Sequence, residues 1–240
     1  GTVEAVTFRL GSPGDAVTPG SDLESATRVA EALDLPPRVV HASPGALLDL
    51  LDVVLVAGQD WRDFNVHCAL VNAAIGRALA DGTAAGPRPV LLTGDIMNEL
   101  VADYSAEHYQ GREYYRLPRM PRGRLRRHLV DGLDAGDREV GVFAYYGLDT
   151  IQPYALCAEA YAAIPPGLLD SEQAKAELAR AVMGSDIPEH VYRRPKVRAQ
   201  TASSAGIGGT LALLADRGID GAALWQRFCR LMDADAEVLA

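Results

Sequence analysis

Apolar and polar positions along the first hundred residues predict strands that alternate with helices. From Val3 to Leu10 the two kinds of side chain alternate, which is typical of a strand. The stretch 38–41 predicts a second strand. The short apolar run 90–92 predicts a third strand, which we expect to be buried and parallel.

The segments between these strands have helical patterns. Ser21 is the expected N-cap of a helix over about 22–33, with Glu24 as its capping-box partner. Pro44 stands at the favoured first position of a helix that extends past Leu51 to Val54. Further helices are predicted at about 64–80, 139–146, 154–163, 172–183 and 211–215. The small-residue stretch 202–210 is either a mobile loop or a tight crossing of two segments.

This order of elements predicts the fold class. Strands that alternate with helices of this length favour an α/β fold, a Rossmann-like parallel sheet covered on both faces. The second half reads as a mostly helical layer beside that sheet. We therefore predict one domain over 1–240, with the sheet core in 1–100 and the helical layer in 101–240.

Composition narrows the classes of function. The chain has 240 residues and a formal net charge of −9, which argues against a nucleic-acid-binding surface as its main business. Its three cysteines form no CxxC pair and its five histidines form no ligand pair at helical spacing, so a permanent zinc site is not expected. No apolar run reaches 18 residues. We expect a cytoplasmic protein without membrane contact, and we interpret the arginine run 122–127 as a solvated or salt-bridged face.

The candidate functional residues lie at the end of one predicted strand and at two lysines. Thr93-Gly94-Asp95 follows the third predicted strand, where ligands bind in doubly wound sheets, although Asp95 could equally cap the next helix. Of 23 basic residues only Lys175 and Lys196 are lysines. An ammonium has a tunable pKa that a guanidinium lacks. Three polar residues of the long helix are further candidates for a substrate pocket: Asn65, His67 and Asn72.

Several motifs in one order resemble the synthetase domain of asparagine synthetases. The stretch 93–100 is similar to the family's TGDG(A/G)DEL segment, and Asp137-Arg138 with Gly147-Leu148-Asp149 is similar to its DR…GLE stretch. Further matches are Ala163 to Pro166, Lys175 with Arg180, and Arg194-Pro195-Lys196, which resembles the RPK ending. Residues 214–219 resemble the tail of the β-lactam and carbapenam synthetase branch, and 8–11 resemble the end of the family's second strand.

The resemblance implies an ATP-pyrophosphatase fold of the adenine nucleotide alpha hydrolase type. In that chemistry ATP with Mg2+ adenylates a carboxylate of a small molecule or peptide, and an amine then attacks to form an amide. Lys196 matches the family's catalytic lysine, which stabilises phosphate charge. Asp149 stands where asparagine synthetases have a glutamate and would help the amine, unless it serves only in a turn. The resemblance places Leu10, Gly11, Thr93, Gly94 and Asp95 at the nucleotide, and Asn98 at the metal.

Departures from the family pattern all concern the nucleotide site. The family's first strand, with its SGGxDS loop, is absent, as are the N-terminal cysteine and the glutaminase domain. Ile96 and Met97 replace small residues where the backbone should approach phosphate, and neutral Asn98 replaces an aspartate. Loss of a central strand would leave buried backbone groups without partners, at about 1–3 kcal/mol each. We therefore expect a second polypeptide or an N-terminal segment to complete the sheet.

Three hypotheses follow. The first is an amide-forming synthetase of bacterial small-molecule or peptide tailoring, completed by that second chain or segment. The second is a non-catalytic, asparagine-synthetase-like binding or scaffold subunit with a degraded nucleotide site. The third keeps the adenylation step but passes the acyl group to water, a thiol or a hydrazine.

Overall fold

The computed structural model describes residues 3–17, 19–82, 88–102, 104, 106–131, 138–157, 160–161, 163–169, 171, 173–194, 197–202 and 208–233. The chain divides into two compact units that are interleaved along the sequence. Unit 1 comprises Gly1–Pro89, Gly136–Asp149 and Arg194–Ala240, and unit 2 comprises Val90–Ala135 and Thr150–Arg193. The protein is α/β, with small parallel and antiparallel sheets among many helices. No helix in the described part of the chain is long and apolar enough to cross a membrane.

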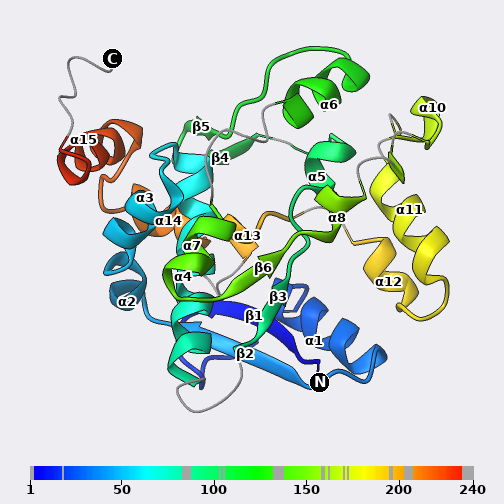
Figure 1. Ribbon diagram of the computed structural model, residues 1–240, viewed down its shortest axis with the longest axis horizontal. Coiled ribbons are helices and arrows are strands. Elements are labelled where there is room, and N and C mark those ends of the chain that lie inside the picture. The colour runs from blue at the N-terminus through cyan, green and yellow to red at the C-terminus, as the bar shows by residue number, and fades with distance from the viewer. Residues whose placement is uncertain are drawn as a thin grey trace. The chain divides into compact units, whose positions relative to one another are not determined.

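Two parallel strands form the sheet of unit 1 (Figure 1). Strand β1 (Ala5–Leu10) pairs with β2 (Pro37–Ala42) in a register that runs from Ala5 opposite Pro37 to Leu10 opposite Ala42. Both strands are rich in β-branched and aromatic residues, which fit a pleated and half-buried surface. The first two predicted strands are thus confirmed, with boundaries shifted by one or two residues.

The helices of unit 1 begin where the sequence supplies a cap. In α1 (Asp22–Ala32) the Ser21 side chain accepts the Glu24 N–H at 3.3 Å, and in α2 (Pro44–Leu48) Ser43 accepts the Ala46 N–H at 3.2 Å. The helix predicted to continue from Pro44 to Val54 is instead broken after α2. The remaining helices of unit 1 are α3 (Leu51–Gly58), α4 (Asp63–Gly82), α7 (Val140–Tyr145), α13 (Ala199–Ala202), α14 (Gly209–Ala215) and α15 (Gly221–Leu231).

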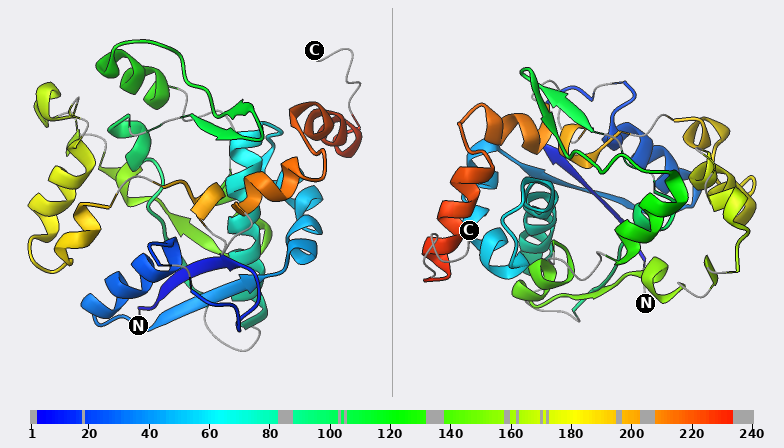
Figure 2. Two further views of the ribbon diagram at one scale, coloured as in Figure 1. Left: turned by 180° about the vertical axis from the view of Figure 1, so that it is seen from behind. Right: turned by 90° about the horizontal axis from the view of Figure 1, so that it is seen from above.

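Helix α4 is the centre of the unit 1 core, and it packs against β1 and β2, as does α1 (Figures 1 and 2). Phe8 and Leu10 on β1 and Val40 on β2 meet apolar side chains of α4. The same cluster takes buried residues from α2, α3, α7, α14 and α15, among them Leu47, Leu51, Leu55, Val142, Leu214 and Leu224. This burial stabilises unit 1 by roughly 25 cal/mol for each Å² of apolar surface removed from water.

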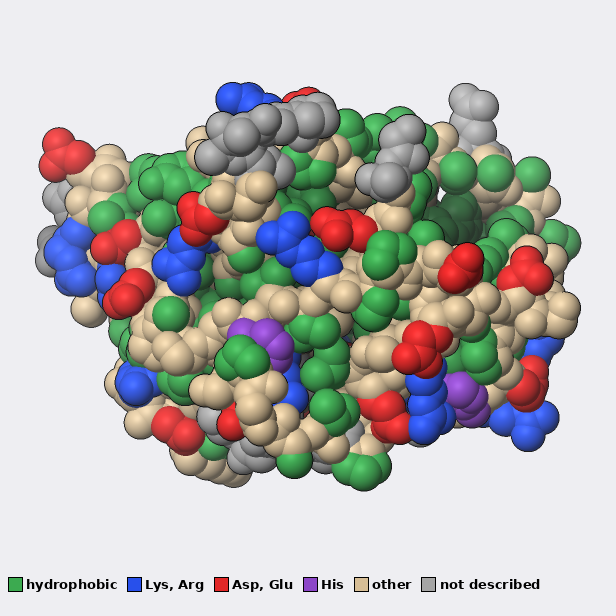
Figure 3. All heavy atoms as spheres, turned by 90° about the horizontal axis from the view of Figure 1, so that it is seen from below, with side chains coloured by type: hydrophobic (Ala, Val, Ile, Leu, Met, Phe, Trp, Pro, Cys, Tyr) green, Lys and Arg blue, Asp and Glu red, His purple; other side chains and the backbone are tan. Residues whose placement is uncertain are grey.

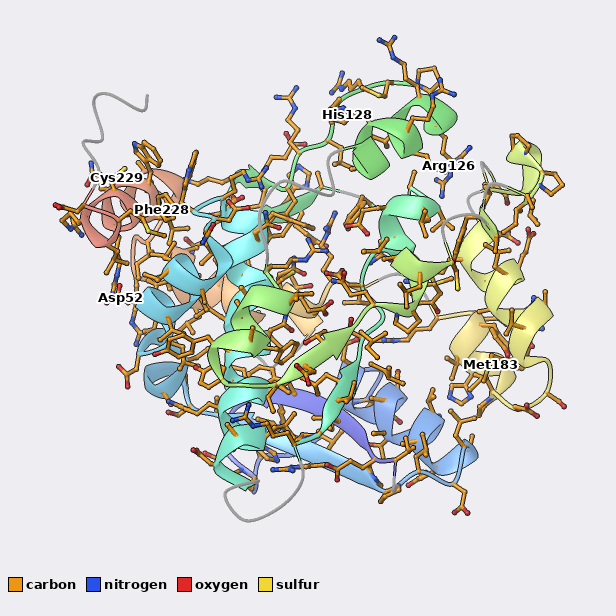
Figure 4. All side chains as sticks on the ribbon, viewed as in Figure 1. Asp52, Arg126, His128, Met183, Phe228 and Cys229 are labelled. Carbon is orange, nitrogen blue, oxygen red and sulfur yellow. The ribbon has the colours of Figure 1, made fainter. Side chains whose placement is uncertain are left out.

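Helix α15 covers α3 through contacts that the sequence analysis did not predict. The Trp61 and Trp225 rings lie 4.9 Å apart, and Arg227 Nε donates to Asp52 Oδ1 at 2.5 Å. Figure 4 shows Asp52 on α3 beside the helix that carries Phe228 and Cys229. The described end of the chain is thereby fixed to the core of unit 1.

Unit 2 consists of short elements. Strand β3 (Val90–Leu92) pairs with β6 (Asp149–Ile151), of which Thr150 and Ile151 belong to unit 2. Strands β4 (Glu107–Tyr109) and β5 (Arg112–Tyr114) form an antiparallel hairpin. The helices are α5 (Met97–Leu100), α6 (Arg122–Asp131), α8 (Pro153–Leu156), α10 (Pro166–Leu169), α11 (Ala174–Met183) and α12 (Glu189–Tyr192). A small core forms around Val101, Leu169 and Ala174. The hairpin lies in the part of the chain that we predicted to be a mostly helical layer, and we predicted no strands there.

Candidate functional site

The turn after β3 holds Thr93, Gly94 and Asp95 together, as the sequence predicts. Thr93 N–H donates to Ile151 C=O at 3.1 Å, which fixes the start of the turn to β6. A Cβ built on Gly94 would meet no atom within 4 Å, so a ligand has open space beside this backbone. One expectation is wrong: β3 is not buried, because Val90 is 54% and Leu92 68% exposed. Strand β3 pairs only with β6 among the described strands, and one neighbour does not enclose it.

Ile96, the next residue of the turn, has an unusual backbone conformation. Its φ of 77° lies in the left-handed region, where a β-branched side chain is a genuine outlier. Such a conformation costs of the order of 1–3 kcal/mol and is often found at functional sites. Ile96 thus has a backbone conformation that glycine adopts more readily.

Asn98 and Lys175 are brought together by the fold of unit 2. Lys175 Nζ donates to Asn98 Oδ1 at 2.9 Å. Lys175 is partly buried and has a polar side-chain partner on another element of unit 2. An ammonium on the amide oxygen disfavours a dication on the same oxygen, because the two positive charges would repel at short range. Among the described residues, no group of three His, Cys, Asp or Glu side chains could hold a metal ion.

Glu99 is a buried carboxylate beside the turn that the sequence analysis did not single out. It is 7% exposed and accepts a hydrogen bond from the Tyr104 hydroxyl. Arg122 Nη2 donates to the Val101 carbonyl at 2.8 Å, which ties α6 to the end of α5. These bonds hold the short helix α5 in place, since a four-residue helix has little stability of its own.

The loop after β1 is closed by its own carboxylate. Gly11, with φ of 136°, leads into a turn in which Ser12 N–H donates to Asp15 Oδ2 at 2.7 Å. Arg9 is 4% exposed and donates to the carbonyls of Asp15 and Ala16. The Asp15 carboxylate already accepts from the Ser12 amide, so the geometry favours a structural role for Gly11.

The structure describes only one of the two predicted catalytic residues. Asp149 is exposed at the first position of β6. Lys196 lies outside the described residues, as do Pro195 and Asp137. Arg194, from the same RPK motif, donates to Asp22 Oδ1 at 2.6 Å. The contact joins the motif to the first turn of α1.

A polar cluster at the start of α4 contains residues from distant parts of the sequence. Asp60 is 5% exposed, binds Arg62 through both carboxylate oxygens and also accepts from Asn65. The Asp60 hydrogen bond raises the pKa of Arg62. The guanidinium carbons of Arg138 and Arg198 lie 4.9 and 5.7 Å from the centroid of the Phe64 ring.

The three polar residues predicted on this helix differ in environment. Arg138 Nη1 donates to Asn65 Oδ1 at 3.3 Å, and Asn72 Nδ2 donates to the Arg138 carbonyl at 2.8 Å. Both asparagines therefore hold the Arg138 segment. His67 is 2% exposed inside the core, and burial lowers its pKa to about 3. Only the Asp60-x-Arg62 spacing could have indicated the cluster from sequence, because Arg138 and Arg198 are remote in the chain.

No protein-family model matches this chain, and no curated protein sequence matches it significantly. The resemblance to asparagine synthetases therefore rests on its sequence motifs alone.

Proposed function

We propose that the chain is the C-terminal part of the synthetase domain of an ATP-dependent, amide-forming enzyme, closer to β-lactam synthetases than to glutamine-dependent asparagine synthetases. It adenylates a carboxylate of a small molecule or peptide, releases pyrophosphate, and directs an amine onto the acyl-adenylate. The fold proposed is the Rossmann-like sheet of that family, completed by a strand from a second polypeptide or segment.

The observation that carries this proposal is the unpaired side of β1. Ala5 N–H donates to Pro36 C=O and Gly11 N–H donates to Ala42 C=O, so odd-numbered residues of β1 face β2. Backbone groups alternate between the two sides of a strand in a parallel sheet. The N–H and C=O groups of the even-numbered residues of β1 therefore point away from β2.

Those outward groups belong to Val6, Phe8 and Leu10. Within the described residues, β1 has no strand on that side and these groups make no hydrogen bond there. Phe8 is 5% and Leu10 1% exposed as whole residues, so their backbone atoms are also hidden from water. Buried backbone groups are almost always paired in native proteins. The resemblance makes β1 the family's second strand and expects a first strand to be missing, so the unpaired side supports it.

The outer side of β2 has the opposite character. Its outward positions are Pro37, Val39 and His41, of which none is buried. Proline cannot donate to a further strand and is common on edge strands. The contrast supports a sheet that ends at β2 and continues beyond β1.

The proposal gives each site residue a role. Lys196 stabilises the negative charge that develops on the phosphates during adenylation and departure of pyrophosphate. Asp149, which is exposed, positions or deprotonates the amine. Thr93, Gly94 and Asp95 form the turn after β3 that contacts the nucleotide. The phosphate loop itself is supplied with the completing strand.

Magnesium is proposed only as the ion that accompanies ATP. Asn98 was the expected ligand, but its side-chain oxygen accepts from Lys175, and the described residues near it form no carboxylate cluster. The residues present therefore do not fit a resident magnesium site, and no step of the proposed reaction depends on one.

Two measurements test the proposal. Native purification followed by denaturing intact-mass analysis should reveal a second polypeptide or segment with a glycine-rich GGxDS loop. The complete assembly should then catalyse ATP–pyrophosphate exchange with a carboxylate substrate. An assembly that carries the loop and yet exchanges no pyrophosphate with any carboxylate and amine pair would contradict the synthetase.

Amide hydrogen exchange tests the completing strand separately. In the isolated chain the amides of Thr7 and Arg9 face β2 and should be protected, whereas those of Val6 and Phe8 should exchange faster. Addition of the completing partner should slow hydrogen exchange at the amides of Val6 and Phe8 and leave the exchange of Thr7 and Arg9 unchanged. Equal protection of both sets in the isolated chain would show that β1 is already paired on both sides.

The second candidate is a non-catalytic subunit with the same fold. One observation favours it: the Lys175 ammonium donates to the Asn98 side-chain oxygen. The resemblance places a metal-binding aspartate at the position of Asn98. Calorimetric titration of the complete assembly with ATP and Mg2+ discriminates the two. Micromolar binding would support the synthetase, and no heat of binding would support the non-catalytic subunit.

A further inference from the structure

Charge is distributed unevenly along the chain. Residues 112–127 contain seven arginines, no lysine and one acidic residue, Glu113. The net charge of −9 therefore divides into +6 on these sixteen residues, which we call the arginine segment, and −15 on the rest of the chain. On the face drawn in Figure 3, by contrast, acidic and basic side chains are interspersed. A positive segment in an otherwise acidic chain indicates an anionic partner.

The arginine segment lies wholly in unit 2 and spans β5, the following loop and the first six residues of α6. Internal contacts account for some of its guanidiniums: Arg122 donates to Val101 C=O, and Arg116 Nε lies 3.7 Å from Glu113. The exposed side chains of Arg119, Arg124 and Arg127 make no hydrogen bond or ion pair with any described residue. Three solvated arginines are thus left in a stretch of nine residues.

Two of these arginines share one face of α6. Arg124 and Arg127 are three positions apart, and His128 follows one turn after Arg124, so the three side chains are neighbours on the helix surface. All three are exposed. Figure 4 shows Arg126 and His128 projecting from α6 in different directions. The ten residues of α6 give this face a length of about 15 Å.

The surroundings of the arginine segment argue against a lipid surface. Binding in a bilayer interface requires exposed apolar side chains on the same helix as the basic ones. None of the large hydrophobic residues that are exposed in the described structure lies in 112–129. Leu125 and Leu129 of α6 are partly covered.

The surroundings also argue against nucleic acid. Single strands bind on exposed aromatic rings, but Tyr115 is 7% exposed and Tyr109 and Tyr114 are half-buried. A nucleic-acid duplex carries one negative charge per roughly 1.7 Å and would extend beyond a helix face of about 15 Å. Its further phosphates would be repelled by the rest of the chain, which has a net charge of −15. A short anionic ligand that is no longer than the arginine segment requires no aromatic platform and does not extend over the acidic remainder of the chain.

We propose that the arginine segment is a docking surface for an acidic polypeptide segment. Its occupant is a helix or extended peptide with carboxylates about one helical turn apart. Arg119, Arg124 and Arg127 pair with those carboxylates, since a guanidinium fork binds a carboxylate through two parallel hydrogen bonds. This surface is independent of the proposed adenylation chemistry, and its test requires no enzymatic activity.

The experiment measures binding of a fluorescein-labelled twelve-residue oligoglutamate to the full chain by anisotropy at 50 mM salt. We expect micromolar binding that weakens at least tenfold at 200 mM salt. Arg124→Gln with Arg127→Gln should weaken binding about tenfold. The matched control, Arg217→Gln with Arg230→Gln, removes the same charge from two exposed arginines outside the segment and should change binding less than twofold.

A second variant, Arg119→Gln, lies outside α6 and separates loss of charge from damage to the helix. It should weaken binding about threefold with an unchanged melting temperature. The proposal is overturned if the peptide binds no better than a neutral peptide, or if the control pair weakens binding as much as the α6 pair. It is also overturned if a twelve-nucleotide RNA or anionic vesicles bind the segment more tightly than the peptide.

Discussion

At the residue scale, the left-handed conformation of Ile96 leads to the most direct prediction. Ile96→Gly should raise the free energy of unfolding by about 1 kcal/mol, because a strain of roughly 1–3 kcal/mol is relieved at an entropic cost of about 0.5–1 kcal/mol. Urea denaturation measures the change. Ile96→Ala is the control, since it keeps a Cβ and therefore the strain. A glycine variant less stable than the parent would show that contacts of the Ile96 side chain outweigh its backbone.

His67 makes stability depend on pH. Burial lowers its pKa from 6.5 to about 3 in the folded protein, whereas the unfolded chain binds a proton near 6.5. The unfolded state therefore takes up one more proton between these values, and this contribution to stability is complete above pH 6.5 and is lost as the pH falls toward 3. The loss is of the order of a few kcal/mol at pH 4.

Urea titrations at pH 7 and pH 4.5 check this effect. His67→Gln should be less stable than the parent at pH 7 but should lose less stability on acidification. The expectation fails if both proteins respond equally to the change of pH.

Local chemistry at single residues could be predicted, but burial could not. Ser21 and Ser43 cap α1 and α2 as their positions indicate, because capping depends on neighbours within three residues. His67 was a candidate for a substrate-pocket contact and lies in the core. Helix α4 is buried on most sides, so its polar residues gave no sign of which face meets water.

At the element scale, α4 and α7 approach closely at a glycine. A Cβ on Gly76 would lie 2.7 Å from a ring carbon of Tyr146 and 3.3 Å from Phe143. Gly76→Ala should destabilise the protein by about 1–3 kcal/mol, because the aromatic rings must shift. Gly45→Ala in α2 is the matched control, since its Cβ would meet no atom within 4 Å, and it should be neutral or slightly stabilising. Thermal unfolding compares the two variants.

The first residue of α14 makes an even closer approach. Gly209 has φ of 69°, and a Cβ there would lie 1.9 Å from the Gln200 carbonyl oxygen. A backbone atom cannot move aside as a side-chain end can, so Gly209→Ala should cost about 3 kcal/mol or more. Chemical denaturation measures this, and a loss below 1 kcal/mol would contradict the crossing. Gly209 approaches Gln200 closely, whereas residues 203–207 lie outside the described residues, so the interpretation of 202–210 as a whole stays a prediction.

Elements were predictable where their pattern was long enough. Strands β1 and β2, with six residues each, and helix α4, with twenty, were found near their predicted bounds. The β4–β5 hairpin was missed, because its strands have three residues each and follow no apolar alternation. The break between α2 and α3 was missed because leucines continue through it at helical spacing.

At the scale of the whole molecule, the α/β class follows from the sequence, but the two interleaved units do not. Units 1 and 2 are each assembled from segments on both sides of residue 100, where a sheet core and a helical layer were expected to divide. Contacts such as Arg194 with Asp22 join positions 172 residues apart. Periodicity within one window contains no information about such pairs, which is also why the cluster around Phe64 was not anticipated.

The unpaired side of β1 also bears on how the purified chain behaves. Strand edges that are apolar, unprotected and without a partner are templates for aggregation. Phe8 and Leu10 are buried, so this side is reached only when the segments that cover it open; two copies can then satisfy the outward groups of Val6, Phe8 and Leu10 by pairing β1 with β1. The isolated chain should therefore scatter more light as its concentration rises. Solubility recovered on coexpression with a candidate for the proposed completing strand would be an early and inexpensive sign that the right partner has been found.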